Sequence, residues 1–114
     1  MMKMMMMMMM MMLKVMTLWF NFLQIKKKKR LLIKELRGGY QKREATFYRY
    51  WRNCNVKPEN LAKAGFFYFN LDDQVQCVFC FEILKNWKPR QIPLLEHKKR
   101  NPNCIFVQKM LIPD

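Results

Sequence analysis

Four residues in the second half of the chain have the types and the spacing of metal ligands. Cys77 and Cys80 are separated by two residues, and His97 and then Cys104 follow downstream. A Cys-x-x-Cys turn can present two thiolates to one ion, and an imidazole and a third thiolate can close a tetrahedron around it. This ligand set suits Zn²⁺ and leaves no open position for water. The spacing therefore predicts one structural zinc ion whose binding is coupled to folding.

Other uses of the cysteines fit the sequence less well. A redox Cys77–Cys80 pair would need a thioredoxin-like βαβ context, which the downstream pattern does not supply. Two disulfides would need an oxidising compartment, and the chain carries no clean secretory signal. Cys54 is the remaining cysteine, and we interpret it as a small buried hydrophobe rather than a reactive thiol.

The 114 residues divide into two parts of different composition. Residues 1–37 hold most of the 13 methionines and a large excess of Lys and Arg over acids, whereas residues 38–114 hold all four cysteines and the only histidine. We expect residues 1–37 to be a low-complexity, Met-rich and basic extension, either a membrane anchor or disordered. We expect residues 38–114 to form the zinc domain, with its core at 43–107. A domain of this size has a marginal hydrophobic core, so we expect bound metal to stabilise its fold.

The N-terminal part contains an apolar run, residues 4–25, that is long enough to span a bilayer. Lys14 opposes insertion by roughly 2.5–3.5 kcal/mol near the centre of a span. In a membrane anchor the basic cluster 26–30, and with it the zinc domain, would lie on the cytoplasmic side. The cluster 26–30 is equally consistent with a nuclear-import signal or with a patch that binds an anionic surface. We therefore expect a cytoplasmic or nuclear location, with a membrane-anchored form as the alternative.

The hydrophobic pattern predicts a small α+β domain with a three-stranded antiparallel sheet and short helices. A first helix is expected over 43–53, with Phe47, Tyr50 and Trp51 on one face. A second helix should have Pro58 in its first turn and should end just before Gly65. The remaining expected elements are strands at 66–69, 74–76 and 82–87, a turn at 70–73, and a last helix opening at Pro93.

The segment from Arg43 to about Val107 resembles the baculoviral inhibitor-of-apoptosis repeat, or BIR domain. The matching motifs are Arg43-x-x-Thr46-Phe47, Trp51, Leu61-Ala62-x-Ala64-Gly65-Phe66, Asp73-x-Val75-x-Cys77-x-x-Cys80, Leu84-x-x-Trp87, Pro93-x-x-Glu96-His97 and Cys104-x-Phe106. The resemblance implies the small zinc-stabilised BIR fold, with Cys77, Cys80, His97 and Cys104 as its ligands. In size the chain is similar to survivin, a single-repeat member. The short connection from Phe66 to Cys77 is similar to repeats of the larger apoptosis inhibitors.

The resemblance also implies a non-enzymatic peptide-binding module that regulates apoptosis, cell division or both. BIR domains bind peptides with a free N-terminal Ala by adding them as a strand to the third sheet strand. The implied partners are caspases, their antagonists with N-terminal Ala, and chromosomal passenger or histone-tail partners; protease inhibition is an implied activity. The implied groove consists of Ile83, Leu84, Lys85, Asn86, Trp87, Gln91, Glu96 and Arg100.

This groove departs from the family pattern in charge. Gln91-Ile92 stands where the family typically has an acidic pair, and residues 82–100 carry six basic side chains against two acids, Glu82 and Glu96. Like charges around a cationic peptide end reduce affinity and slow encounter. We therefore expect weakened binding of Ala-N-terminal or basic histone-tail peptides and a shift toward acidic partners.

Two other functions remain open. The net charge of +14 and the interleaved run Tyr48-Arg49-Tyr50-Trp51-Arg52 favour a basic zinc finger that binds nucleic acid. Against this, we interpret those aromatic residues as the core face of the first helix. The chain could also be a degenerate BIR protein that has lost peptide binding. We do not expect an enzyme, because the only histidine is committed to a closed metal site.

Overall fold

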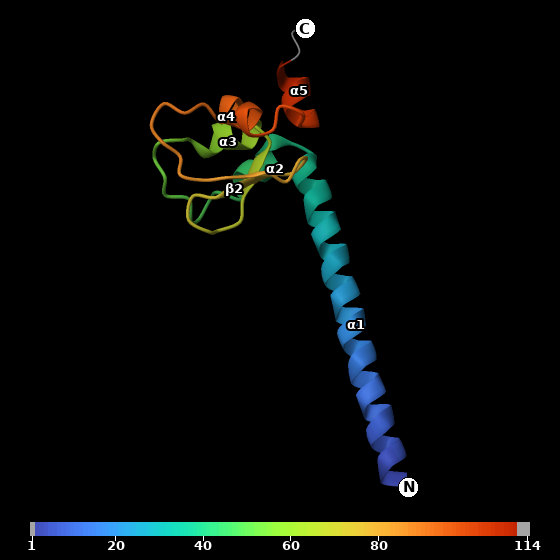
Figure 1. Ribbon diagram of the computed structural model, residues 1–114. Coiled ribbons are helices and arrows are strands. Elements are labelled where there is room, and N and C mark those ends of the chain that lie inside the picture. Colours follow the sequence, from blue (N-terminus) through green and yellow to red (C-terminus); the bar gives the residue numbers. More distant parts are fainter. Residues whose placement is uncertain (1, 112–114) are drawn as a thin grey trace. The chain divides into compact units, whose positions relative to one another are not determined.

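The structure is a computed structural model that describes residues 2–111. Internal contacts divide the chain into two compact units, Met1–Leu32 and Ile33–Asp114. Helix α1 (Met2–Arg37) covers the first unit and continues into the second as one uninterrupted helix (Figure 1). It is rich in Met, Leu and Lys, which are strong helix formers, and it contains no Gly or Pro. It ends where the Gly38 amide donates to the Glu35 carbonyl at 2.9 Å.

Four short helices belong to the second unit: α2 (Tyr40–Ala45), α3 (Pro58–Lys63), α4 (Pro93–Arg100) and α5 (Ile105–Leu111). Pro58 and Pro93 each occupy a first turn, where no amide hydrogen is needed. α3 lies beside α4, as Figure 1 shows, and also contacts α2.

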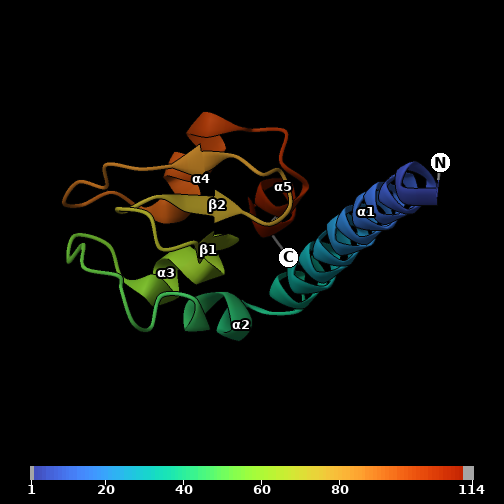
Figure 2. The same ribbon diagram turned by 90° about the horizontal axis from the view of Figure 1, so that it is seen from below.

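Three strands form an antiparallel sheet in the order β1-β2-β3: β1 (Phe66–Tyr68), β2 (Val75–Cys77) and β3 (Ile83–Leu84). Phe66 pairs with Cys77 across β1 and β2, and Val75 pairs with Leu84 across β2 and β3. Figure 2 shows β1 beside β2, with α2 next to α3. The sheet confirms the predicted α+β class, and β3 lies at its edge.

The core of the second unit lies around the sheet and includes two of the predicted metal ligands. Its buried members are Phe47, Val56, Leu61, Ala64, Phe66, Tyr68, Val75, Cys77, Trp87, Cys104 and Val107. Phe66 is fully buried and stands edge-on to Trp87, with ring centroids 6.0 Å apart. The same core therefore packs against both the metal ligands and the β3 end of the sheet.

The first predicted helix is wrong in extent. α2 ends at Ala45, and residues 46–50 are turns. The Thr46 hydroxyl donates to the Arg43 carbonyl at 2.6 Å and accepts the Tyr68 amide at 2.8 Å, so the chain leaves the helix to join β1. Phe47 is buried as expected, but Tyr50 is 55% exposed and Tyr48 is 91% exposed. The interpretation of this aromatic run as one core face is therefore wrong for both tyrosines.

Three further features differ from the sequence-based expectation. α5 was not predicted; it begins with exposed Ile105 and half-buried Phe106, and it places Val107 in the core. Cys54 is exposed, not buried, and its thiol lies 3.6 Å from the Arg52 carbonyl. The expected domain start at residue 38 also differs from the contact boundary, because Leu36 is buried within the second unit.

Candidate metal centre and peptide groove

The four predicted ligands come from four different parts of the second unit. Cys77 ends β2, Cys80 lies in the following turn, His97 lies within α4, and Cys104 directly precedes α5. Their ligand atoms all lie within 4.8 Å of one another. The end of β2 and the turn after it therefore supply one pair of ligands, and α4 and the residue before α5 supply the other.

Two of the distances between ligand atoms match the edges of a tetrahedral zinc site. The Cys77 and Cys104 Sγ atoms are 3.8 Å apart, and Cys80 Sγ is 3.5 Å from His97 Nε2. Zinc–sulfur bonds of about 2.3 Å and a zinc–nitrogen bond of about 2.0 Å give tetrahedral edges of about 3.8 and 3.5 Å. A disulfide requires a sulfur–sulfur distance of about 2.05 Å. All four cysteines are free thiols, so the cluster fits one zinc ion.

Burial makes this cluster dependent on a cation. It raises the pKa of the Cys77 thiol to about 12, although the Cys80 and Phe79 amides donate to this sulfur and oppose the rise. Burial also lowers the pKa of His97. The His97 Nδ1 atom lies 2.8 Å from the Ala64 carbonyl, which fixes it as the protonated nitrogen and leaves Nε2 for the metal. Bound zinc would stabilise the thiolates that the apolar surroundings disfavour.

Comparison with known proteins places this ligand set in a family. The family model described as BIR, the Inhibitor of Apoptosis domain, matches residues 43–108. The chain belongs to the BIR family. The four BIR ligands found from spacing are those that the fold brings together, which confirms the predicted zinc site.

Several curated relatives contain a similar BIR segment. The chain is 44% identical over 62 residues to the E3 ubiquitin-protein ligase XIAP of Rattus norvegicus, a match that covers 54% of this chain and 12% of that protein. It is 42% identical over 73 residues to Baculoviral IAP repeat-containing protein 5.1-B of Xenopus laevis, covering 60% of this chain and 46% of that protein. This chain thus matches less than half the length of either relative.

Solved BIR domains share the fold. The autoinhibited dIAP1-BIR1 domain aligns with a TM-score of 0.58 and 27% identity over 61% of this chain and 73% of that one. DIAP1 BIR1 bound to a Grim peptide aligns with a TM-score of 0.57 and 24% identity, over 65% of this chain and 91% of that one. The sheet and the short helices of the second unit therefore form a BIR fold.

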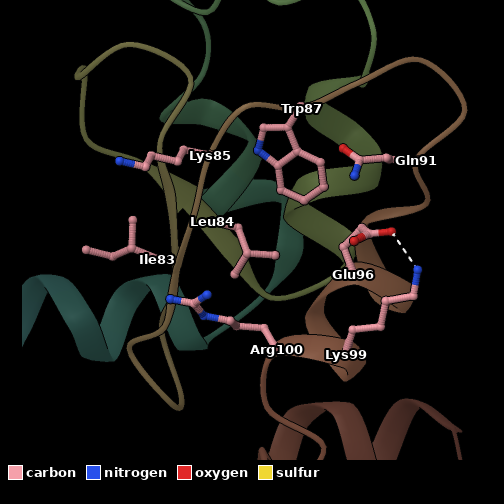
Figure 3. A pocket seen from close by; sticks show the side chains of 8 residues that line it. All are labelled: Ile83, Leu84, Lys85, Trp87, Gln91, Glu96, Lys99 and Arg100. Carbon is pink, nitrogen blue, oxygen red and sulfur yellow. Dashed lines mark hydrogen bonds and ion pairs between the residues drawn. The ribbon is translucent and has the colours of Figure 1, made fainter.

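A groove of about 400 Å³ runs between the edge strand β3 and α4 (Figure 3). It is lined by Ile83, Leu84, Lys85, Trp87, Gln91, Glu96, Lys99 and Arg100. The sequence-based set therefore comes together here except for Asn86, which is exposed beside the groove at a φ of 60°. Lys99 lines the groove but was not among the predicted residues. Its position, one helical turn after Glu96, could have indicated it.

The acids near the groove are already paired with basic side chains. Glu96 Oε1 lies 3.3 Å from Lys99 Nζ, a pair that Figure 3 marks, and Glu82 Oε2 lies 3.1 Å from Arg100 Nε. Lys85 adds a further cation to the lining. A peptide ammonium entering here would have to compete with Lys99 for Glu96, the acid that lines the groove.

Asp73 holds the strand end that carries Trp87. Its carboxylate accepts the Asn86 amide at 2.9 Å, the Trp87 amide at 2.8 Å and the Asn53 side-chain amide at 3.0 Å. Burial alone would raise the pKa of Asp73, but these hydrogen bonds hold it below its ordinary value. Trp87 Nε1 is buried, with no hydrogen-bond partner within residues 2–111. The indole lining the groove thus keeps a free donor.

Proposed function

We propose that this BIR domain binds extended peptides at the β3 edge. The observation that carries the proposal is the groove between β3 and α4, with Leu84 and Trp87 along one wall. An edge strand has backbone amides and carbonyls available for another strand, and an adjacent pocket can select a side chain. The solved complex of DIAP1 BIR1 with a Grim peptide supports peptides as the class of partner.

The charge of the groove selects among peptides. Three of its lining side chains are cationic, namely Lys85, Lys99 and Arg100, and its one acid is paired. Acidic side chains on a peptide would meet complementary charge, whereas a free N-terminal ammonium or a basic histone tail would meet like charge. We therefore propose acidic peptide segments of proteins that control cell death or cell division as the partners.

Titration calorimetry with matched peptides tests this function. An acidic peptide should bind at least tenfold more tightly than the same peptide with Lys in place of its acids, and N-acetylation should not weaken it. Replacing Lys85 and Arg100 with Glu should remove the acidic preference, and replacing exposed Lys57 and Lys109, which do not line the groove, with Glu should leave it intact. Micromolar affinity for a free-amine Ala peptide, lost on N-acetylation, would contradict the proposed preference.

Nucleic acid is a second candidate because of the exposed aromatic run. Tyr48 and Tyr50 flank Arg49 around a surface hollow that Thr46 and Asn70 complete. Exposed aromatic rings beside cations can stack with single-stranded bases. Binding of an oligonucleotide should then fall steeply with added salt and be lost in Tyr48→Ala, whereas peptide binding at β3 should change only mildly with salt.

A further inference from the structure

The first unit presents apolar side chains on every side of α1. Each apolar residue of the segment 5–25 is exposed, from 45% for Leu23 to 69% for Met5. A helix that is apolar all round is stable when protein or lipid surrounds it. This segment precedes the BIR match at residues 43–108, so the family does not account for it.

The length and composition of the segment fit a bilayer. The helical stretch Met5–Arg37 contains an 18-residue window with a mean hydropathy of 1.5, none of it buried. At 1.5 Å per residue, residues 5–25 rise about 31 Å, close to the roughly 30 Å of a hydrocarbon core. A helix satisfies its own backbone hydrogen bonds, which lipid requires.

The few polar residues of the segment share one narrow face. Lys14, Thr17, Asn21 and Gln24 follow one another at intervals of three or four residues. The Thr17 hydroxyl donates to the Leu13 carbonyl at 2.8 Å, so it needs no water. A helix that lies on a membrane surface needs a broad, strongly charged face, and this stripe holds a single charge. The pattern therefore favours crossing the bilayer over lying on it.

The charges after the segment set its direction. Lys26, Lys27, Lys28, Lys29 and Arg30 follow the apolar run, and the first acid of the chain is Glu35. Lys26 Nζ lies 4.7 Å from the Phe22 ring centroid, so this cation lies directly beside the last aromatic ring. Basic residues next to a span remain on the cytoplasmic side and attract anionic lipids. Residues 26–37 contain no small residue that would provide a cleavage site.

We propose that residues 5–25 cross a lipid bilayer, with residues 26–30 at its anionic cytoplasmic face and the BIR domain on that same side. The reducing cytoplasm suits the free thiolates of the zinc site. This inference is independent of what the β3 groove binds.

Cell-free synthesis of the full chain with sealed phosphatidylcholine–phosphatidylserine vesicles tests insertion. The chain should float with the vesicles after an alkaline carbonate wash and after nuclease treatment. The double change Leu13→Arg and Leu18→Arg should reduce the floated fraction at least tenfold, and Lys14→Leu should increase it. The matched control, Leu95→Arg with Ile105→Arg, adds the same charge at exposed positions of the BIR domain and should float like the unchanged chain.

Any of three results would overturn insertion: extraction by carbonate, loss after nuclease treatment, or equal flotation of the Leu13/Leu18 variant. Direction is tested by protease added outside sealed microsomes. Digestion of the BIR domain with protection of a fragment containing 5–25 is the expected result. A protected BIR domain, or a chain shortened by cleavage after the apolar run, would overturn the proposed arrangement. Replacing residues 26–30 with Gln should give a mixture of both directions.

Discussion

At the level of single residues, the two ring nitrogens of His97 have different tasks. Nδ1 contacts the Ala64 carbonyl, and Nε2 faces the sulfur of Cys80. The imidazole also packs against Phe66, with ring centroids 4.5 Å apart. Zinc binding therefore joins α4 to the end of α3 and to the Cys77–Cys80 turn, and loss of one ligand should affect the whole domain.

We expect His97→Ala to abolish stoichiometric zinc binding and to destabilise the folded domain. The loss of zinc affinity should exceed the roughly 10- to 100-fold loss that follows a change in a residue that only hydrogen-bonds to a ligand. Metal analysis and circular dichroism of the purified protein measure both properties. Cys54→Ser is the matched control, because Cys54 is exposed and outside the cluster. One zinc per chain in the His97 variant would contradict the assigned ligand set.

Acid should destabilise the domain through the same histidine. Unfolded His97 titrates near pH 6.5, whereas burial lowers the pKa of His97 in the folded domain. As pH falls below about 6.5, the unfolded chain binds more protons, so the free energy of unfolding decreases. Zinc release should accompany this decrease, because protons compete for the ligands. Denaturant titrations between about pH 7.5 and 5 measure the free energy of unfolding, and a zinc indicator measures zinc release. A free energy of unfolding that stays constant over this range would contradict the expectation.

In alkali, the free energy of unfolding of the metal-free domain should decrease as the pH rises, opposite to the dependence expected in acid. Burial raises the pKa of Cys77 from 9.0 to about 12 in the folded chain. Between these values the unfolded thiol loses its proton first, so stability falls as pH rises. Zinc-loaded protein should not show this loss, since its thiols are already deprotonated. Measuring the stability of metal-free and zinc-loaded protein side by side separates the effect of thiol ionisation from general alkaline unfolding.

At the level of elements, Gly65 makes the connection from α3 to β1. It has a φ of +95°, and its amide donates to the Ala62 carbonyl at 3.1 Å. A Cβ here would lie 2.9 Å from the ring of Phe106. The turn therefore requires a residue without a side chain both for its backbone angle and for the close approach of α5.

Gly65→Ala should lower the free energy of unfolding by about 2–4 kcal/mol, from backbone strain plus overpacking. Gly39→Ala is the control: its added Cβ would meet only the end of the flexible Gln41 side chain, at 3.2 Å, so the change should be small. Urea titration of zinc-loaded protein measures both. Equal stability of the two variants would refute the requirement at Gly65.

At the level of the whole molecule, the C-terminal end of α1 belongs to the second unit, which contains the BIR domain. Leu36 is only 4% exposed, and its carbonyl accepts buried Arg43 Nη1 at 2.9 Å. Arg43 Nε also donates to the Ala62 carbonyl at 2.8 Å, and Arg37 Nε to the Val78 carbonyl at 2.8 Å. Arg43 thus joins the end of α1 to the end of α3, where helix carbonyls lack intrahelical partners.

A chain that starts at Ile33 should therefore fold with zinc, and one that starts at Gly38 should be less stable by about 3 kcal/mol. The difference combines the lost burial of Leu36, about 1.5–3 kcal/mol, with the lost carbonyl partner of Arg43. Thermal unfolding of both zinc-loaded fragments measures it. Adding Leu36→Ala to the longer fragment should reproduce part of the loss, and equal stability of the two fragments would contradict the expectation.

The sequence by itself determined the zinc ligands, the three antiparallel strands, the helices that begin at Pro58 and Pro93, and the apolar run before the basic cluster. These depend on residue type and local spacing, because Cys and His bind zinc wherever a turn and a helix bring them together. The turn at 70–73 was equally local, and Asn70 and Asp72 adopt the expected positive φ. The peptide-binding roles of the groove residues stay a prediction.

Only the tertiary structure decided where α2 ends and how exposed Cys54, Tyr48 and Tyr50 are. It also decided which acids near the groove form ion pairs with basic side chains. α2 ends where Thr46 binds the amide of Tyr68, 22 residues away, and Glu82 pairs with Arg100 across 18 residues. Propensity and periodicity describe neighbours along the chain, so they cannot supply partners at such separations. The physical reason is that burial and charge pairing depend on which distant groups the packed core brings into contact.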